Sequence, residues 1–185
     1  MLQAVWQGKA GRIEQDGSSV RWRELFRRSE DLLSATIFGR FPYLSDAALS
    51  AVLECLIGKP AASLSPFDKL ELWPRLTQFE ERSYVEPDVL LRFRDELIMI
   101  EVKPPFGGAQ YREQWLAQTR ALAAEDEYAN YQQIYYVALG NAQLQPLTRD
   151  ELPQARFVGM TLREWGQLRQ SLLESSAFDT CRQDK

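Results

Sequence analysis

The sequence contains no histidine and only two cysteines, Cys55 and Cys181. The absence of histidine excludes general acid–base catalysis by an imidazole, and it excludes zinc sites with histidine ligands. Two cysteines are too few for a disulfide framework or a cysteine-based zinc cluster. A metal site in this chain would therefore be built from oxygen ligands, which are the ligands that Mg²⁺ prefers.

Long apolar runs are also missing from this chain of 185 residues. A membrane-spanning helix needs about 20 consecutive apolar residues, and no run approaches that length. The start, MLQAVWQGKAGRIEQDG, lacks the basic-then-apolar order of a secretory signal. We therefore expect a cytoplasmic protein with no membrane partner. Its length suits a single domain over residues 1–185, with residues 1–20 as an N-terminal arm or hairpin and residues 177–185 as a polar tail.

There is no excess of positive charge, since 22 lysines and arginines face 26 acidic residues and the formal net charge is −4. The overall charge therefore gives no sign of nucleic-acid binding. Arginine nevertheless outnumbers lysine 17 to 5, and Arg21, Arg23, Arg27 and Arg28 occupy one short segment. A guanidinium group can bind a phosphate with two hydrogen bonds. The segment is either a phosphate-contacting face or a solvated helix face, and its composition alone leaves both interpretations open.

The apolar pattern predicts an α/β (α+β mixed) fold. Helical spacing is found first, then a run of strands, a helix, a strand, and a final strand and helix. The helix between the third and fourth strands implies a parallel pair, so we expect a central mixed β-sheet flanked by helices. The expected helices cover residues 21–38, 45–57, 110–124 and a segment opened by a capping box from Thr161 to Glu164, and the expected strands cover 74–80, 85–93, 97–103, QQIYYVALG and ARFVGM.

The stretch PDVLLRFRDELIMIEVK, residues 87–103, places charged groups among buried strand residues. A hairpin with a two-residue turn at Arg94-Asp95 sets Asp88 opposite Glu101, with their Cβ atoms about 5 Å apart. Lys103, two residues beyond Glu101, then points to the same face. Two close carboxylates repel each other unless a cation neutralises them. Either a divalent ion held by oxygen ligands or a purely structural salt bridge to Lys103 would meet this need.

These residues resemble the signature of the PD-(D/E)xK nuclease superfamily: Pro87-Asp88, followed by Glu101-Val102-Lys103 at the end of the next apolar strand. The resemblance covers roughly residues 22–140 in the order of elements. It implies a restriction-endonuclease-like core in which Asp88 and Glu101 bind Mg²⁺ or Mn²⁺. It also implies that Lys103 is the catalytic lysine beside the attacked phosphodiester of a DNA substrate.

Members of that superfamily often carry a further acidic residue on the first core helix. Helical geometry places Glu30 at the border of the apolar stripe and Asp31 nearly opposite it. We therefore expect Glu30 to join the site, both as a catalytic residue and as a metal ligand, while Asp31 faces solvent. Arg23 and Arg27 lie on the same side as Glu30, where they would contact DNA phosphates or pair with Glu30.

In the helix after Lys103, Gln110, Gln114 and Gln118 recur at a spacing of four residues and form a polar stripe. Some relatives in the superfamily place a positioning glutamine on this helix. Gln114 or Gln118 would orient a phosphate or the waters of a metal, and Gln118 enters our set of catalytic residues. A solvated helix edge is the alternative interpretation.

Three functions remain open from the sequence. The first is a divalent-metal-dependent nuclease acting on DNA, or else on RNA, in a restriction, phage-defence or repair system. The second is a non-catalytic or regulatory nuclease fold that binds protein or nucleic acid. The third is an unrelated α/β protein in which the Glu-x-Lys spacing is accidental. A core of this size leaves little room for sequence-reading elements, so we expect a homodimer or a subunit of a larger complex.

Overall fold

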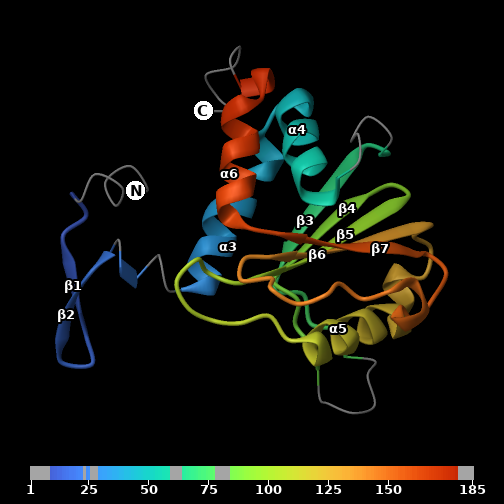
Figure 1. Ribbon diagram of the computed structural model, residues 1–185, viewed down its shortest axis with the longest axis horizontal. Helices are drawn as coiled ribbons and strands as arrows, with labels where there is room; N and C mark the ends of the chain where they lie inside the picture. Colours follow the sequence, from blue (N-terminus) through green and yellow to red (C-terminus); the bar gives the residue numbers. More distant parts are fainter. Residues whose placement is uncertain (1–8, 23, 26–28, 59–63, 78–83, 179–185) are drawn as a thin grey trace.

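The computed structural model describes residues 9–22, 24–25, 29–58, 64–77 and 84–178 (Figure 1). The chain begins with an antiparallel hairpin of β1 (Arg12–Gln15) and β2 (Ser18–Arg21), which stands apart from the main sheet in Figure 1. Its turn is Asp16-Gly17, and both residues have positive φ angles, 50° and 75°. Aspartate and glycine tolerate this backbone region, which explains why the chain reverses at this point.

The centre of the fold is a mixed sheet of five strands in the order β3-β4-β5-β6-β7. The pairs β3/β4 and β4/β5 are antiparallel, whereas β5/β6 and β6/β7 are parallel. A mixed sheet flanked by helices is the α/β (α+β) class that the sequence predicts. The strands are β3 (Phe67–Leu72), β4 (Val89–Phe93), β5 (Glu96–Val102), β6 (Gln133–Leu139) and β7 (Phe157–Arg163).

Helices cover both faces of this sheet. In Figure 1, α3, α4 and α6 lie on one face and α5 lies on the other. None of the helices in the described part of the chain is both long and apolar enough to cross a membrane. The helices are α3 (Glu30–Phe38), α4 (Asp46–Ile57), α5 (Arg112–Ala124) and α6 (Trp165–Glu174), with short 3₁₀ helices η1 (Phe41–Tyr43), η3 (Asp126–Tyr128), η4 (Arg149–Glu151) and η5 (Ser176–Phe178).

Strand β5 is buried along its whole length because both of its faces are covered. Ile98, Ile100 and Val102 pack toward the core that includes α4. Leu97 and Met99 alternate with them and pack toward the core that includes α5. A strand covered on both faces is apolar at successive positions and does not alternate between apolar and polar residues. Residues Leu97 to Ile100 of β5 show this apolar run.

The register of the β4/β5 hairpin is the one that the sequence predicts. Val89 pairs with Ile100 and Leu91 with Ile98, across the two-residue connection Arg94-Asp95. The predicted boundaries of α4 are also confirmed. The Ser45 side chain accepts a hydrogen bond from the Ala48 amide, and Gly58 closes the helix with a φ of 69°. Both caps use the chemistry expected of those residue types.

The strand predicted at residues 74–80 is wrong where the structure describes it. Trp73 has a φ of 51°, and Pro74 has no amide hydrogen to give to a strand pair. In residues 74–77 the pairing is limited to the isolated bridge Leu76↔Val85, while residues 78–80 lie outside the described residues. The strand beside β4 is instead β3, whose period of two is interrupted by a register shift between Phe67 and Lys69.

The predicted starts of two other helices also need correction. Arg21 belongs to β2, and Ser29 has an extended backbone that caps α3, so the helix expected over residues 21–38 is not continuous. The capping box from Thr161 to Glu164 is wrong as well. Thr161 lies inside β7, and Glu164 is itself the N-cap of α6, paired with Gln167. The helix predicted at Gln110 starts two residues later, at Arg112.

Gly140 ends β6 at a crowded point, which generates a first testable prediction. Its φ is 86°, and a Cβ there would overlap the Lys103 carbonyl oxygen and lie 2.7 Å from Trp165 Nε1. We expect Gly140→Ala to lower the free energy of unfolding by about 1–3 kcal/mol, the cost of one strained backbone position. Gly159→Ala is the matched control, because a Cβ at Gly159 meets nothing within 4 Å. Urea unfolding of both variants measures the difference, and equal stabilities would contradict the crowding at Gly140.

Candidate functional site

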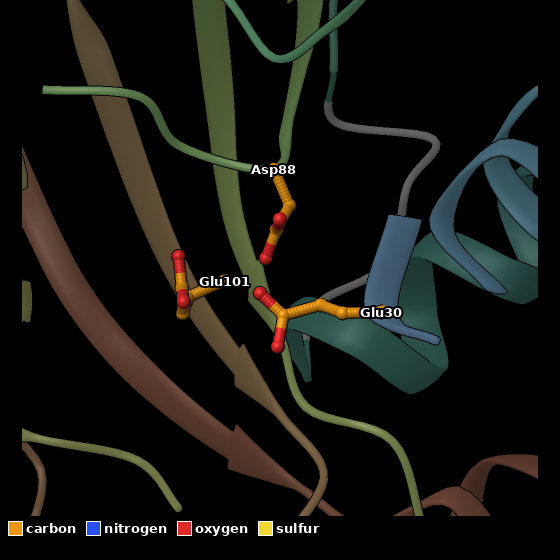
Figure 2. Close-up of side chains that lie close together, drawn as sticks. All are labelled: Glu30, Asp88 and Glu101. Carbon is orange, nitrogen blue, oxygen red and sulfur yellow. The ribbon is translucent and has the colours of Figure 1, made fainter. Parts of the chain in front are cut away.

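Three carboxylates from three separate elements converge beside the end of β5. Asp88 precedes β4, Glu101 lies near the end of β5, and Glu30 begins α3. One oxygen from each carboxylate can be chosen so that all three lie within 4.8 Å of one another. Figure 2 shows the three side chains directed toward a common space. The predicted hairpin register brings Asp88 to Glu101, and the tertiary fold adds Glu30.

The start of α3 decides which acidic residue enters this cluster. The Ser29 side chain accepts a hydrogen bond from the Leu32 amide at 3.4 Å, so the helix begins with Glu30 and Asp31 in its first turn. Negative side chains are favourable there because the helix dipole is positive at its N-terminus. Glu30 is half-buried and joins the cluster, whereas Asp31 is exposed, as the helical geometry predicts. The predicted phosphate contacts Arg23 and Arg27 lie outside the described residues.

The Glu101 carboxylate is almost fully buried, with 1% of the residue exposed, and is held on both oxygens. Oε1 accepts hydrogen bonds from Lys103 Nζ at 2.5 Å and from Gln114 Nε2 at 2.6 Å. Oε2 accepts a hydrogen bond from Gln118 Nε2 at 2.6 Å. Because donors from α5 and from the residue after β5 reach both oxygens, the carboxylate is fixed in one orientation.

Lys103 connects Glu101 to Glu30. Its Nζ donates to Glu101 and also lies 3.1 Å from each carboxylate oxygen of Glu30. Burial by itself would lower the pKa of Lys103, but the charges and hydrogen bonds of Glu101 and Glu30 outweigh burial and raise that pKa above its ordinary value. Lys103 is therefore an ammonium, a donor of hydrogen bonds, at neutral pH.

Asp88 is the carboxylate whose charge has the least compensation. Its Oδ2 accepts a hydrogen bond from the Val102 amide at 2.7 Å. Burial raises the pKa of Asp88 to about 8, and the nearby charge of Glu101 adds to the rise, while the Val102 amide opposes it. Burial also raises the pKa of Glu30, although Lys103 partly offsets that effect. One ammonium therefore does not neutralise three carboxylates, and the raised pKa of Asp88 favours its protonated form.

The three glutamines of the polar stripe, Gln110, Gln114 and Gln118, have two different roles. Gln114 and Gln118 both donate to the Glu101 carboxylate, so the solvated-edge interpretation does not describe them. Gln110 serves the backbone instead. Its Nε2 donates to the Gly140 carbonyl at 3.2 Å, and its Oε1 accepts from Trp115 Nε1 at 2.8 Å. Gln110 therefore ties the start of α5 to the end of β6.

Tyr136 supports the site, although the sequence pattern marks it only as a residue of the strand QQIYYVALG. This tyrosine is fully buried on β6, and its hydroxyl donates to Gln118 Oε1. Burial raises the pKa of Tyr136 well above its usual range, so the hydroxyl keeps its proton. The bond leaves the Gln118 NH₂ group directed at Glu101. The sequence does offer one sign of this role, a tyrosine within a strand that is buried on both faces. A buried phenol needs a hydrogen-bond partner, so such a tyrosine points to a polar side chain beside it.

The cluster fits a divalent metal ion on chemical grounds. Carboxylate oxygens are the hard ligands that Mg²⁺ and Mn²⁺ accept. The raised pKa of Asp88, caused by burial and by Glu101, marks a site that lacks positive charge. A cation bound by Asp88, Glu101 and Glu30 would supply that charge, and these are the residues that could hold it.

Comparison of the chain with protein-family models, with curated proteins and with solved structures found no match in any of the three.

The pKa of Asp88 leads to a prediction about the stability of the metal-free protein. A carboxyl with a raised pKa in the folded state contributes stability below its unfolded pKa, near 3.9, and that stability is lost as the pH rises toward about 8. The asparagine of Asp88→Asn cannot titrate, yet its amide oxygen can still accept the Val102 hydrogen bond. We therefore expect the stability of Asp88→Asn relative to the parent to increase with pH by at least about 1.4 kcal/mol, the value of one pKa unit.

Urea unfolding in EDTA at several pH values between about 5 and 8.5, within the range of the titration, measures this difference. Asp31→Asn is the control, because Asp31 neighbours Glu30 in the sequence but is exposed. A stability difference between Asp88→Asn and the parent that does not change with pH would contradict the proposed protonation of Asp88.

Tyr136 gives a second prediction at this site. Tyr136→Phe leaves Gln118 Oε1 buried without its donor, which we expect to lower stability by about 1–3 kcal/mol. Because the Gln118 amide can then rotate away from Glu101, we also expect Mn²⁺ affinity to fall about tenfold. Tyr135→Phe is the control, since that hydroxyl donates to Gln133 on the other face of the sheet. Calorimetric Mn²⁺ titration measures the affinity, and an unchanged affinity in Tyr136→Phe would limit Tyr136 to a structural role.

Proposed function

We propose that this protein is a divalent-metal-dependent nuclease of the PD-(D/E)xK type, which hydrolyses phosphodiester bonds in DNA. The observation that carries the proposal is the shared position of Asp88, Glu101, Glu30 and the Lys103 ammonium at the end of one strand pair. The four groups meet in three dimensions, although Glu30 and Lys103 are 73 positions apart in the chain. An accidental Glu-x-Lys spacing would not require a third carboxylate or the two glutamines on Glu101.

Asp88, Glu101 and Glu30 are the residues that would hold the metal ion. When bound, a divalent ion supplies Lewis-acid stabilisation of negative charge on a phosphoryl oxygen. The chain keeps these ligands in position by the Val102 amide on Asp88 and by Gln114 and Gln118 on Glu101. Such supporting hydrogen bonds orient the carboxylates before any substrate arrives.

Lys103 is the residue that we propose acts on the scissile phosphate. Glu101 and Glu30 raise its pKa against the effect of burial, so it serves as a proton-bearing donor rather than as a base. An ammonium held between carboxylates can stabilise the negative charge that develops on a phosphate in the transition state. Glu30 is the least buried of the three carboxylates and lies where solvent meets the cluster, so it is suited to accept a proton from the attacking water.

A DNA substrate and a cytoplasmic location form part of the proposal. A restriction, phage-defence or repair role would suit such an enzyme, with target selection supplied by a second copy or by a partner protein. The direct test incubates the purified protein with single-stranded, duplex and branched DNA in Mg²⁺, in Mn²⁺ and in EDTA. We expect cleavage that needs the metal ion. A folded protein that binds Mn²⁺ but cuts no DNA or RNA substrate would favour the non-catalytic or regulatory alternative.

Lys103→Met separates catalysis from simple charge pairing. If Lys103 stabilises the transition state, the variant should keep its fold and its Mn²⁺ binding and lose about a hundred- to a thousand-fold in cleavage rate. Lys69→Met is the control, because Lys69 also pairs with a carboxylate, Glu71, but lies on β3. Single-turnover cleavage with circular dichroism of each variant provides the measurement. A folded Lys103→Met protein that cuts at the parent rate would remove Lys103 from the mechanism.

A further inference from the structure

Residues 104–109 form the Lys103 loop, which directly follows Lys103 between β5 and α5. Pro104 is buried, whereas residues 105–109 are exposed. In Figure 1 the loop arches out from the end of the sheet before the chain enters α5. Its two prolines have no amide hydrogen, and Gly107 and Gly108 have positive φ angles of 118° and 72°. A loop of this composition is poorly suited to a regular strand or helix, so contacts from other elements have to satisfy its carbonyl groups.

One side chain from a different element holds this loop. Asn141, two residues after the end of β6, directs Nδ2 at three carbonyl oxygens of the loop. The acceptors are the carbonyls of Pro104 at 2.9 Å, Gly107 at 3.0 Å and Gly108 at 2.9 Å. An amide NH₂ group has two hydrogens, which are shared among these acceptors. Asn141 therefore joins the first residue of the Lys103 loop to its glycine turn.

The backbone of Asn141 is itself fixed. Its φ is 50°, a left-handed conformation that asparagine adopts more readily than most other residues. Its amide donates to Glu164 Oε2 at 3.2 Å, and the next amide, that of Ala142, donates to Glu164 Oε1 at 2.9 Å. Glu164 is the N-cap of α6. The asparagine side chain is therefore presented to the loop from a backbone that the start of α6 anchors.

The Lys103 loop lies against the methylene stem of the lysine. A Cβ built on Gly108 would lie 3.2 Å from Lys103 Cδ and 4.0 Å from Lys103 Cβ. At the other end of the side chain, Nζ donates to Glu101 and to Glu30. Only 7% of Lys103 is exposed. Because a free lysine side chain has many rotamers, a wall along its stem restricts where the ammonium can go.

We propose that Asn141 is a positioning residue for Lys103. By holding the Lys103 loop against the lysine stem, it keeps the ammonium directed at Glu101 and Glu30. Asn141 acts through the loop, since its amide donates to loop carbonyls rather than to the lysine. The inference rests on the proposed nuclease function, because it concerns the control of the same site. A charged group stabilises a transition state when it is held in the productive geometry, and small displacements reduce the rate.

The test measures the accessibility of the Lys103 amine, so that it does not depend on cleavage. The full chain is acylated with an N-hydroxysuccinimide ester, and mass spectrometry gives the reaction rates at Lys103 and at Lys69. Lys69 is the internal reference, because its side chain is 58% exposed on β3. In Asn141→Gly we expect the ratio of the Lys103 rate to the Lys69 rate to rise about three- to tenfold, the change in local opening that the loss of one hydrogen bond allows.

The variants separate the amide from the backbone. Asn141→Gly removes the amide without straining the chain, since glycine adopts a φ of 50° at no steric cost. Asn141→Asp should raise the ratio at least as much, because an ionised carboxylate has no hydrogen to donate to the loop carbonyls. Asn130→Gly is the control, because Asn130 is an exposed asparagine in the turn before β6. Single-turnover cleavage of DNA at saturating Mn²⁺ should fall about three- to tenfold in both Asn141 variants and stay unchanged in Asn130→Gly.

Urea unfolding of the same variants separates positioning from a general loss of stability. If Asn141 only stabilises the fold, its variants should unfold at lower urea while the ratio of the two acylation rates stays at the parent value. An unchanged ratio in both folded Asn141 variants would overturn the positioning proposal, and cleavage that needs metal and Lys103 in such proteins would leave the nuclease function standing. A raised ratio in a protein that cuts no nucleic acid would support the hold of Asn141 on Lys103 and contradict the enzyme.

Discussion

The Lys103 ammonium, shared between Glu101 on the strand before it and Glu30 on α3, is the interaction that the rest of the site depends on. It joins the start of α3 to the end of the sheet, and this one ammonium has to offset three carboxylates. Burial raises the pKa of Asp88 and the nearby charge of Glu101 adds to the rise, because a buried carboxylate beside another negative charge is costly. A purely structural cluster could be more stable with one carboxylate fewer. The presence of all three is what a cation-binding role would require.

The backbone around Lys103 explains how this ammonium is held at the end of the sheet. The Lys103 amide donates to the Leu139 carbonyl at 2.7 Å, and the Lys103 carbonyl accepts from Trp165 Nε1 at 2.7 Å. Hydrogen bonds from β6 and α6 thus hold the backbone of Lys103, the first residue after the end of β5. The absence of a side chain at Gly140 lets these groups approach, because a Cβ there would occupy the same space. The functional residue is therefore anchored to the core behind it.

Much of the site could be predicted from the sequence because it depends on local periodicity. The two apolar runs of β4 and β5, joined by the two-residue turn Arg94-Asp95, set the register that brings Asp88 to Glu101. The helical phase separates Glu30 from Asp31. Contacts made by distant parts of the chain could not be predicted in this way. The bond from Tyr136 to Gln118 and the hydrogen bonds of Asn141 to the loop after Lys103 join residues from different elements. The strand expected at residues 74–80 is absent from residues 74–77, which the structure describes. The positive φ of Trp73 and the missing amide hydrogen of Pro74 interrupt strand pairing there, despite the apolar pattern.

Calorimetric titration of Mn²⁺ at neutral pH, in two buffers with different heats of ionisation, measures metal binding and proton release together. A cluster that holds a proton on Asp88 must release it when a cation takes its place, because metal ligands bind in their deprotonated form. We expect saturable binding at one site with the release of about one proton, and the loss of both in Glu101→Gln. No binding of Mn²⁺ by the folded protein, or binding that is unchanged in Glu101→Gln, would contradict the assignment of Asp88, Glu101 and Glu30 as a metal site.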